Sequence, residues 1–149
     1  MEVTQENPGK LEMKEKSKLK ILIVEDDFAS FKILEEYLHE YGDCSVAVNG
    51  SEAVEVFKKA SEEGKPYDLI CLDILLPVMN GHLALEEICQ IEQECGLKRA
   101  KVIMTTAIDD TEDIIKAFKE GCKAYIVKPV TNEKLFAEMR KLGLVKQTE

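Results

Sequence analysis

The chain has 149 residues, 45% of them apolar, and a formal net charge of −9. This length supports one domain with one core and is too short for two comfortable ones. The acidity, and the lack of a basic stripe, argue against nucleic acid or an anionic membrane surface as the direct partner.

The N-terminal stretch from Met1 to Lys18 is rich in charge and has no sustained apolar period. It cannot bury enough surface to offset the entropy of ordering, so residues 1–18 are predicted to be a flexible extension. It lacks the apolar core of a secretory signal, and no run of eighteen apolar residues follows, so a cytoplasmic protein is expected. The five cysteines form no C-x-x-C pair, and buried free thiols are predicted.

In chain order, residues 19–24 form an apolar, β-branched run that stops at Glu25-Asp26-Asp27, which predicts a buried strand. Helical spacing of apolar residues follows from Phe28 to Tyr41, with Asp27 as a plausible cap and Gly42 as the stop. A short strand is expected at residues 44–48. A second helix is expected over residues 53–60, before Gly64.

Residues 69–77 set Asp73 inside an otherwise apolar run, which predicts a strand buried on both faces with an acid near its carboxyl end. Pro77 and Asn80-Gly81 then predict a loop, and a helix opens near His82 and ends by Gly96. The fourth and fifth strands are expected at residues 101–106 and 124–127. The helix between them is predicted to turn Ile114, Ile115 and Phe118 inward, and a last helix capped by Thr131 runs to Leu142.

Five strands therefore alternate with five helices at intervals of roughly twenty to thirty residues. This cadence predicts the α/β class with a doubly wound parallel sheet. In such a sheet the carboxyl ends of all strands lie along one edge. The polar residues predicted to meet there are Glu25, Asp26, Asp73, Thr106 and Lys128.

Clustered carboxylates repel one another by about 4 kcal/mol per pair at 4 Å and an effective dielectric near 20, and a divalent cation would offset this cost. Hard oxygen ligands favour Mg²⁺, which takes one or two carboxylates together with phosphate and water. Lys128 could pair with Asp73 or with a phosphoryl oxygen, and Thr106 offers a hydroxyl. Asp73 could then act as a nucleophile and hold a phosphoryl group.

The sequence resembles a response-regulator receiver domain of two-component signalling, of the stand-alone, chemotaxis-regulator-like kind. The resemblance covers residues 19–142 and rests on four segments in the family's order and spacing. These are Ile23-Val24-Glu25-Asp26, Asp73 with Pro77 and Gly81, Met104-Thr105-Thr106-Ala107, and Tyr125-Ile126-Val127-Lys128-Pro129.

The resemblance implies a flavodoxin-like sheet of order 2-1-3-4-5 and assigns roles to the residues at its edge. Asp73 would be the phosphoacceptor, and Lys128 would contact the phosphate. Mg²⁺ would be held by Glu25, Asp26, Asp73 and the backbone carbonyl of Leu75. Thr106 and Tyr125 would be the switch pair, and a cis bond is expected before Pro129. Asn80 stands where the family often has Asp.

Some of these residues also have simpler interpretations. Tyr125 is as well explained by ordinary strand packing as by switching. Asp27 is expected to cap a helix rather than bind metal. His82 and His39 are both expected to be solvated.

The leading hypothesis is a signalling module that receives a phosphoryl group on Asp73 from a sensor histidine kinase or a phosphotransfer protein. It would assist its own phosphorylation without being an ordinary enzyme. Residues 143–149 form only a short tail, so output is expected through binding to a downstream target protein. Direct contact with nucleic acid or a membrane is not expected, and the chain is expected to be a monomer or a phosphorylation-dependent dimer.

Three other functions are weaker. A flavodoxin-like nucleotide carrier would need small residues with free amides after the first strand, where this chain has acids. A Mg²⁺-dependent phosphohydrolase would need an acid two residues after Asp73, where this chain has Leu75. A phosphorylation-independent module is disfavoured by the intact acidic set.

Overall fold

The computed structural model describes residues 18–146, over which five strands alternate with five helices as predicted. The strands are β1 (Leu19–Val24), β2 (Gly42–Ala47), β3 (Leu69–Leu72), β4 (Lys101–Thr106) and β5 (Ala124–Val127). The helices are α3 (Phe28–Leu38), α4 (Gly50–Glu62), α5 (Gly81–Cys95), α6 (Thr111–Glu120) and α7 (Asn132–Lys141). The predicted N-terminal extension lies outside the described residues except for Lys18, and the last three residues of the predicted tail lie outside them as well.

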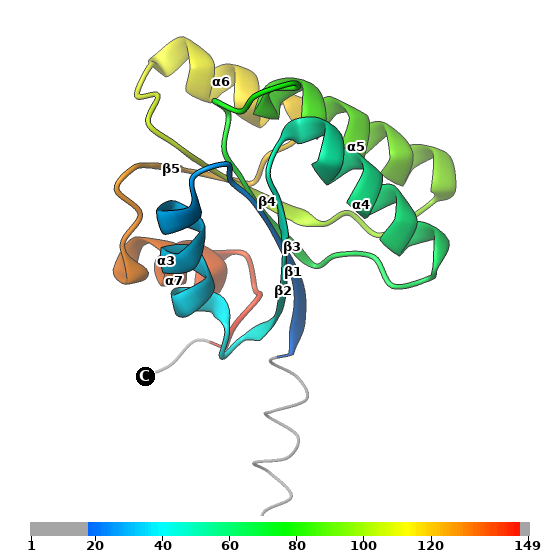
Figure 1. Ribbon diagram of the computed structural model, residues 1–149, viewed down its shortest axis with the longest axis horizontal. Coiled ribbons are helices and arrows are strands. Elements are labelled where there is room, and N and C mark those ends of the chain that lie inside the picture. The colour runs from blue at the N-terminus through cyan, green and yellow to red at the C-terminus, as the bar shows by residue number, and fades with distance from the viewer. Residues whose placement is uncertain (1–17, 147–149) are drawn as a thin grey trace, which may run out of the picture.

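All strand pairs are parallel, and their order is β2-β1-β3-β4-β5, which confirms the flavodoxin-like α/β fold. Helices α3 and α7 cover one face of the sheet, and α4, α5 and α6 cover the other (Figure 1). In β1, Leu22 and Val24 join the core under α4–α6, whereas Ile21 and Ile23 join the core under α3 and α7. Burial on both faces is the reason for the unbroken apolar runs.

The structure corrects several predicted boundaries. Helix α3 ends at Leu38 rather than continuing to Tyr41, because the chain turns there and the Tyr41 N–H donates to the Leu38 carbonyl. Strand β2 begins at Gly42, where an added Cβ would lie 2.0 Å from the Leu19 carbonyl oxygen, so the missing side chain lets β1 and β2 pair earlier. Strand β3 ends at Leu72, and Asp73 is therefore the first residue of the loop that follows.

The predicted inner face of α6 is wrong in part. Ile115 is 50% exposed and Phe118 is 46% exposed, while Ala117 is the helix's buried residue. A small residue at the point of closest approach lets the helix lie close to its neighbours. Ile115 and Phe118 then fall on the outer surface, and Ile114 is partly buried.

The cysteines agree with prediction except at one position. Cys71 and Cys122 are buried and Cys44 and Cys89 partly buried, but Cys95, the last residue of α5, is exposed. Burial raises the pKa of the Cys71 thiol to about 12, which keeps it protonated and unreactive. Between residues 18 and 146, no helix has both the length and the apolar character needed to cross a membrane.

The start of α5 is hydrogen-bonded to the loop that directly follows β3. The Gly81 N–H donates to the Ile74 carbonyl at 2.9 Å. A Cβ added to Gly81 would lie 2.3 Å from the Asp73 carbonyl oxygen and 2.8 Å from the Ile74 Cα. The contact atoms are backbone, so only glycine permits this approach.

We expect Gly81→Ala to lower the free energy of unfolding by about 1–3 kcal/mol, because the backbone of Asp73 or of α5 must move to admit the methyl group. Urea unfolding measures the change. Gly64→Ala is the control, because a Cβ added to Gly64 has nothing within 4 Å and carries only the cost of its φ of +76°. A loss at Gly81 no greater than the loss at Gly64 would contradict the close approach.

Candidate functional site

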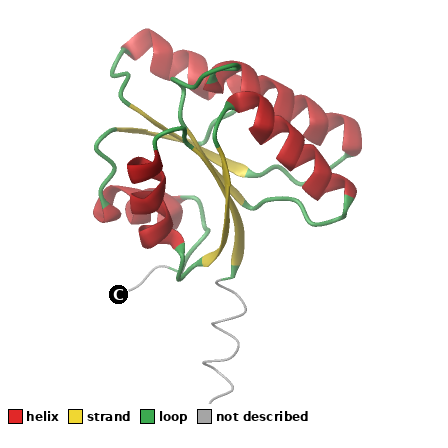
Figure 2. Cartoon of the chain, viewed as in Figure 1, coloured by secondary structure: helices red, strands yellow, loops and turns green. Residues whose placement is uncertain are grey.

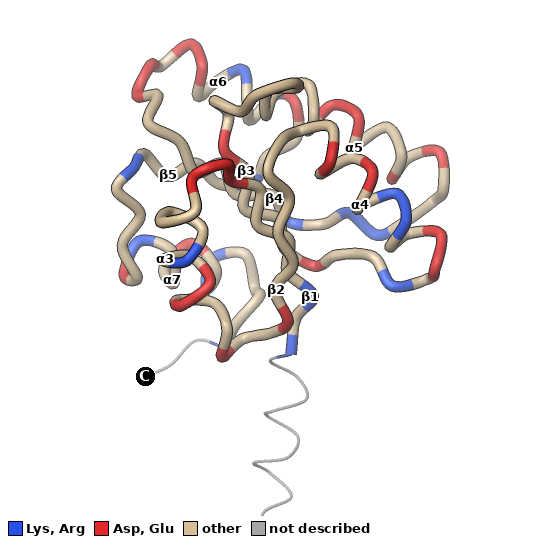
Figure 3. Tube along the Cα trace, in the orientation of Figure 1, with Lys and Arg blue, Asp and Glu red and all other residues tan. Residues whose placement is uncertain are grey.

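Three carboxylates meet at the carboxyl edge of the sheet, as the sequence predicts. Glu25 and Asp26 follow β1, Asp73 follows β3, and one oxygen from each lies within 4.8 Å of the others. The Asp73 N–H donates to the Val24 carbonyl at 3.2 Å, which places the two strand ends side by side. Figure 3 shows the acidic segment that leads from β1 into α3 lying beside the end of β3. Glu25 and Asp73 are only 2% and 4% exposed, whereas Asp26 faces solvent.

Lys128 joins the two buried carboxylates from the end of β5. Its N–H donates to the Thr106 carbonyl at 2.7 Å, and its Nζ donates to Glu25 Oε1 at 2.9 Å and to Asp73 Oδ2 at 3.0 Å. Partial burial alone would lower the pKa of this ammonium, but its bonds to Glu25 and Asp73 outweigh that effect and raise it. The Lys128–Pro129 peptide is cis, as the resemblance implies.

The site retains an excess of negative charge. Three carboxylates and one ammonium give a formal charge of −2 within the cluster. Burial raises the pKa of Glu25; the Lys128 bond opposes this, and repulsion from Asp73 adds to it. The atoms that could bind a metal here are carboxylate oxygens, and one of the three acids, Asp26, is exposed. Mg²⁺ prefers hard oxygen ligands, so these residues fit that ion.

Leu75 lies beside the acids with a largely exposed side chain, and its N–H donates to Asp73 Oδ1 at 3.2 Å. The role of its carbonyl as a metal ligand stays a prediction. Ile108, two residues after Thr106, is partly buried and packs against the core beneath α4–α6.

The expected switch residues lie on neighbouring strands. Thr106 ends β4 and is fully buried, and its hydroxyl accepts a hydrogen bond from the Ile108 N–H at 3.4 Å. Tyr125 in β5 is partly buried, and its hydroxyl lies 3.0 Å from the Ile108 carbonyl and 2.8 Å from Asp113 Oδ2. Tyr125 therefore packs against the core beneath α4–α6, and its hydroxyl is also hydrogen-bonded to Asp113 of α6.

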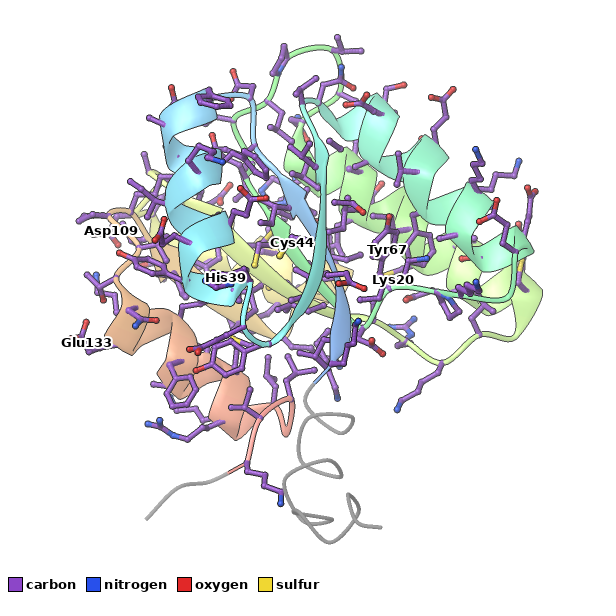
Figure 4. All side chains as sticks on the ribbon, turned by 60° about the horizontal axis from the view of Figure 1, so that its bottom comes forward. Lys20, His39, Cys44, Tyr67, Asp109 and Glu133 are labelled. Atoms are coloured by element: carbon purple, nitrogen blue, oxygen red, sulfur yellow. The ribbon has the colours of Figure 1, made fainter. Side chains whose placement is uncertain are left out.

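Two polar residues act as helix caps rather than as site residues. Asp27 accepts from the Ser30 N–H and caps α3 as predicted, and Asn80 caps α5 by accepting from the Leu83 N–H. His39, at the end of α3, is exposed as predicted (Figure 4).

The prediction that His82 is solvated is wrong. His82 is 7% exposed, and its ring contacts Asp113 and Glu120 of α6. The two acids are seven residues apart and therefore lie two turns apart on one face of α6. That spacing, opposite a histidine at a helix start, is the sequence signal that could have found the contact.

The rim of the site is largely apolar. A cavity of about 140 Å³ lies beside Glu25 and Lys128 and is bordered by Ile33, Leu34 and Val130. In the loop after Asp73, Val78 is 84% exposed and has a φ of +67°, which is costly for a β-branched residue. The loops that carry Val78 and Val130 leave the strands at one edge of the sheet (Figure 2).

Comparison with known proteins agrees with this geometry. The model of the response regulator receiver domain matches residues 21–140, most of the chain. The chain belongs to the response regulator receiver family. A receiver domain is a phosphoacceptor signalling module of two-component systems rather than an ordinary enzyme.

Several relatives share this domain. The chemotaxis protein CheY of Thermotoga maritima is 34% identical over 126 residues, which cover 83% of this chain and 97% of that protein. A probable transcriptional regulator, ycf29, of Porphyra purpurea is 33% identical over 82% of this chain. The chain spans only 55% of that regulator and 7% of a hybrid histidine kinase of Dictyostelium discoideum, so the receiver also occurs within longer proteins.

Solved structures place a metal at such a site. A CheX–CheY complex of Borrelia burgdorferi with BeF₃ and Mg²⁺ superposes with a TM-score of 0.76 and 26% identity, covering 89% of this chain and 99% of that one. The receiver domain of a sensor histidine kinase of Pseudomonas aeruginosa has magnesium in its active-site cleft. It superposes with a TM-score of 0.70 and 27% identity over 83% of this chain and 96% of that one.

We expect Lys128→Met to destabilise the metal-free protein by about 2 kcal/mol and to strengthen Mg²⁺ binding several-fold, because two buried carboxylates lose their shared cation. Urea unfolding and calorimetric Mg²⁺ titration measure the two effects. Lys134→Met is the control, since Lys134 is exposed and its ammonium donates to the Pro129 carbonyl rather than to a carboxylate of the site. Mg²⁺ binding that is unchanged or weaker in Lys128→Met would contradict this account of the charges.

Proposed function

We propose that this protein is a single-domain response regulator that receives a phosphoryl group on Asp73 and signals through altered protein–protein binding. The observation that carries the proposal is the pairing of Asp73 with Lys128 beside Glu25 and Asp26. The carboxylate is buried, oriented by the Leu75 N–H and by Lys128, and next to two further acids. This arrangement suits a nucleophile better than a purely structural ion pair.

The proposed reaction begins with a phosphohistidine on a partner protein. A carboxylate oxygen of Asp73 attacks phosphorus and forms a P–O bond, while the P–N bond breaks and the imidazole leaves with the electron pair. Lys128 would bind a phosphoryl oxygen with its ammonium, which its contacts to Glu25 and Asp73 keep protonated. Thr106 would donate its hydroxyl to another phosphoryl oxygen.

Glu25, Asp26, Asp73 and the Leu75 carbonyl are the residues proposed to hold Mg²⁺. When bound, the ion would neutralise the charge of the transferring group. The formal charge of −2 in the cluster matches that of the divalent cation, and the magnesium in related receivers supports the assignment.

Phosphorylation is proposed to draw the Thr106 hydroxyl toward the phosphoryl group and thereby bias the position of Tyr125. The changed surface would comprise α6, β5 and α7. This is a population shift, so phosphorylation must favour one arrangement by several kcal/mol to make it dominant.

The proposed phosphoryl donor is a sensor histidine kinase or a phosphotransfer protein, and the output is the binding of a target protein. The apolar rim around Asp73, with Leu75 and Val78 exposed, fits a protein donor better than a free metabolite. The proposal locates the protein in the cytoplasm, where ATP supplies the phosphoryl group of histidine kinases. A monomer that dimerises on phosphorylation is compatible with the exposed Ile115 and Phe118 of α6.

We expect Asp73→Asn to take up no phosphoryl group, because the amide has a similar shape and is not a nucleophile. The protein is incubated with a small acyl or amidyl phosphate donor and Mg²⁺, and intact-mass spectrometry counts the added groups. Asp109→Asn, which alters an exposed acid in the loop before α6, is the control (Figure 4). One phosphoryl group on the parent and the control, and none on Asp73→Asn, supports the proposal; equal labelling of all three contradicts it.

The aspartyl phosphate is expected to be long-lived, because hydrolysis needs a water aligned with the scissile bond and polar side chains near the entry path orient that water. Here the two residues that flank the path, Leu75 and Ile108, are apolar. Leu75→Asn combined with Ile108→Glu should shorten the lifetime about tenfold or more, as measured by loss of phosphoryl after removal of the donor. A parent that loses the group as fast as this variant would refute the argument.

A further inference from the structure

The imidazole of His82 is a buried polar group that the proposed chemistry does not use. His82 is the second residue of α5, and its Nδ1 contacts Glu120 while its Nε2 lies 2.8 Å from Asp113 Oδ1. The side chain is 9% exposed, and those of Glu120 and Asp113 are 10% and 18% exposed. His82 therefore bridges two acids that lie two turns apart on α6, one through each ring nitrogen.

Asp113 extends this contact to Tyr125. The other oxygen of Asp113 lies 2.8 Å from the Tyr125 hydroxyl, which also lies 3.0 Å from the Ile108 carbonyl. Burial would raise the pKa of Asp113, but the hydrogen bonds from His82 and Tyr125 outweigh it and hold the pKa below its usual range. Asp113 therefore stays ionised, and a continuous polar chain runs from Glu120 through His82 and Asp113 to Tyr125.

The backbone beside His82 is held close to the loop that begins at Asp73. Its neighbour Gly81 donates to the Ile74 carbonyl and approaches the Asp73 backbone so closely that no side chain fits between them. A shift of the loop after Asp73 must therefore move the base of His82. The residue connects the proposed phosphorylation site with α6.

Helix α6 depends on this connection because its apolar packing is small. Ala117 is its one buried residue, whereas α5 buries the apolar side chains of Ala84, Leu85 and Ile88. Two of its three larger apolar side chains, Ile115 and Phe118, are exposed, and Ile114 is only partly buried. Helices with little buried apolar surface have low local stability, so polar contacts decide where such a helix lies.

We propose that His82 is a positioning residue that holds Asp113, and through it the Tyr125 hydroxyl, in the inward arrangement near the Ile108 carbonyl. We call the contacts of His82 with Glu120 and Asp113, and of Asp113 with Tyr125, the latch. In the unphosphorylated protein the latch holds α6 and Tyr125 together and couples them to the edge that carries Asp73. The coupling to phosphorylation rests on the proposed function, whereas the latch itself does not.

The first test uses the full chain without any phosphoryl group. His82→Leu replaces the imidazole with an apolar side chain of comparable size and loses both ring nitrogens, and His82→Gln keeps one nitrogen that can donate. His39→Leu, at the exposed end of α3, is the control. We expect amide exchange over Thr111–Glu120 to be at least about fivefold faster in His82→Leu, intermediate in His82→Gln and unchanged in His39→Leu, with a shift of the Tyr125 ring signals in NMR only in the His82 variants.

Three results would overturn the latch. One is equal exchange in His82→Leu and the parent. Another is faster exchange spread equally over α4, α7 and the strands with unchanged Tyr125 signals, which would make His82 a general stabiliser only. If His82→Leu does not fold, Asp113→Asn takes its place, and the third overturning result is that this variant leaves the Tyr125 signals and the exchange of α6 as in the parent.

The second test measures coupling with beryllofluoride and Mg²⁺. If the inward arrangement is the one that the phosphoryl group favours, His82→Leu should bind beryllofluoride about fivefold more weakly, because a smaller fraction of the protein is competent. Binding equal to that of the parent overturns the coupling. A parent that binds no beryllofluoride contradicts the proposed function and the coupling with it, while the exchange and NMR results judge the latch independently.

Discussion

The repulsion among carboxylates at one edge of the sheet is the constraint on which the rest of this structure depends. Parallel strands β1 and β3 end side by side, so Glu25 and Asp73 must meet, and both are almost fully buried. Two such charges within 4.8 Å of each other repel by at least about 3.5 kcal/mol at an effective dielectric near 20, before desolvation is counted. Lys128 offsets this cost from β5 through two hydrogen bonds, yet the cluster keeps a net negative charge. A site that is stable enough to fold and still short of positive charge is one that a divalent cation and a phosphoryl group can complete together.

Most of the fold and nearly all of the edge could be predicted from the sequence, for a physical reason. Unbroken apolar runs are long enough to identify each buried strand, and the parallel arrangement brings every strand's last residue to the same edge. Glu25, Asp73 and Lys128 could therefore be placed together without knowing any distance. The fine boundaries could not: the early start of β2 at Gly42 depends on a backbone approach to Leu19 that no periodicity reveals.

The wrong predictions concern helix surfaces, where the neighbours of a side chain are set by tertiary packing. His82 was expected in solvent because it follows a loop glycine, but its partners Asp113 and Glu120 come from a helix about thirty to forty residues later. Ile115 and Phe118 were expected inside because they are apolar, yet α6 packs through Ala117. In both cases a helix surface offered two plausible sides, and the choice depended on which partner the sheet topology delivered.

These two errors describe the same region and have a common consequence. Where α6 meets the start of α5, the side chains of His82, Asp113 and Glu120 are largely buried while Ile115 and Phe118 are exposed; further along α5, Ala84, Leu85 and Ile88 are buried instead. Apolar burial changes gradually as a helix slides, whereas hydrogen bonds to a buried imidazole are either made or lost within a short displacement. A helix held by such bonds has discrete positions rather than a continuum of them. That property is what an element needs if it is to report, by its position, whether the edge that carries Asp73 has gained a charged group.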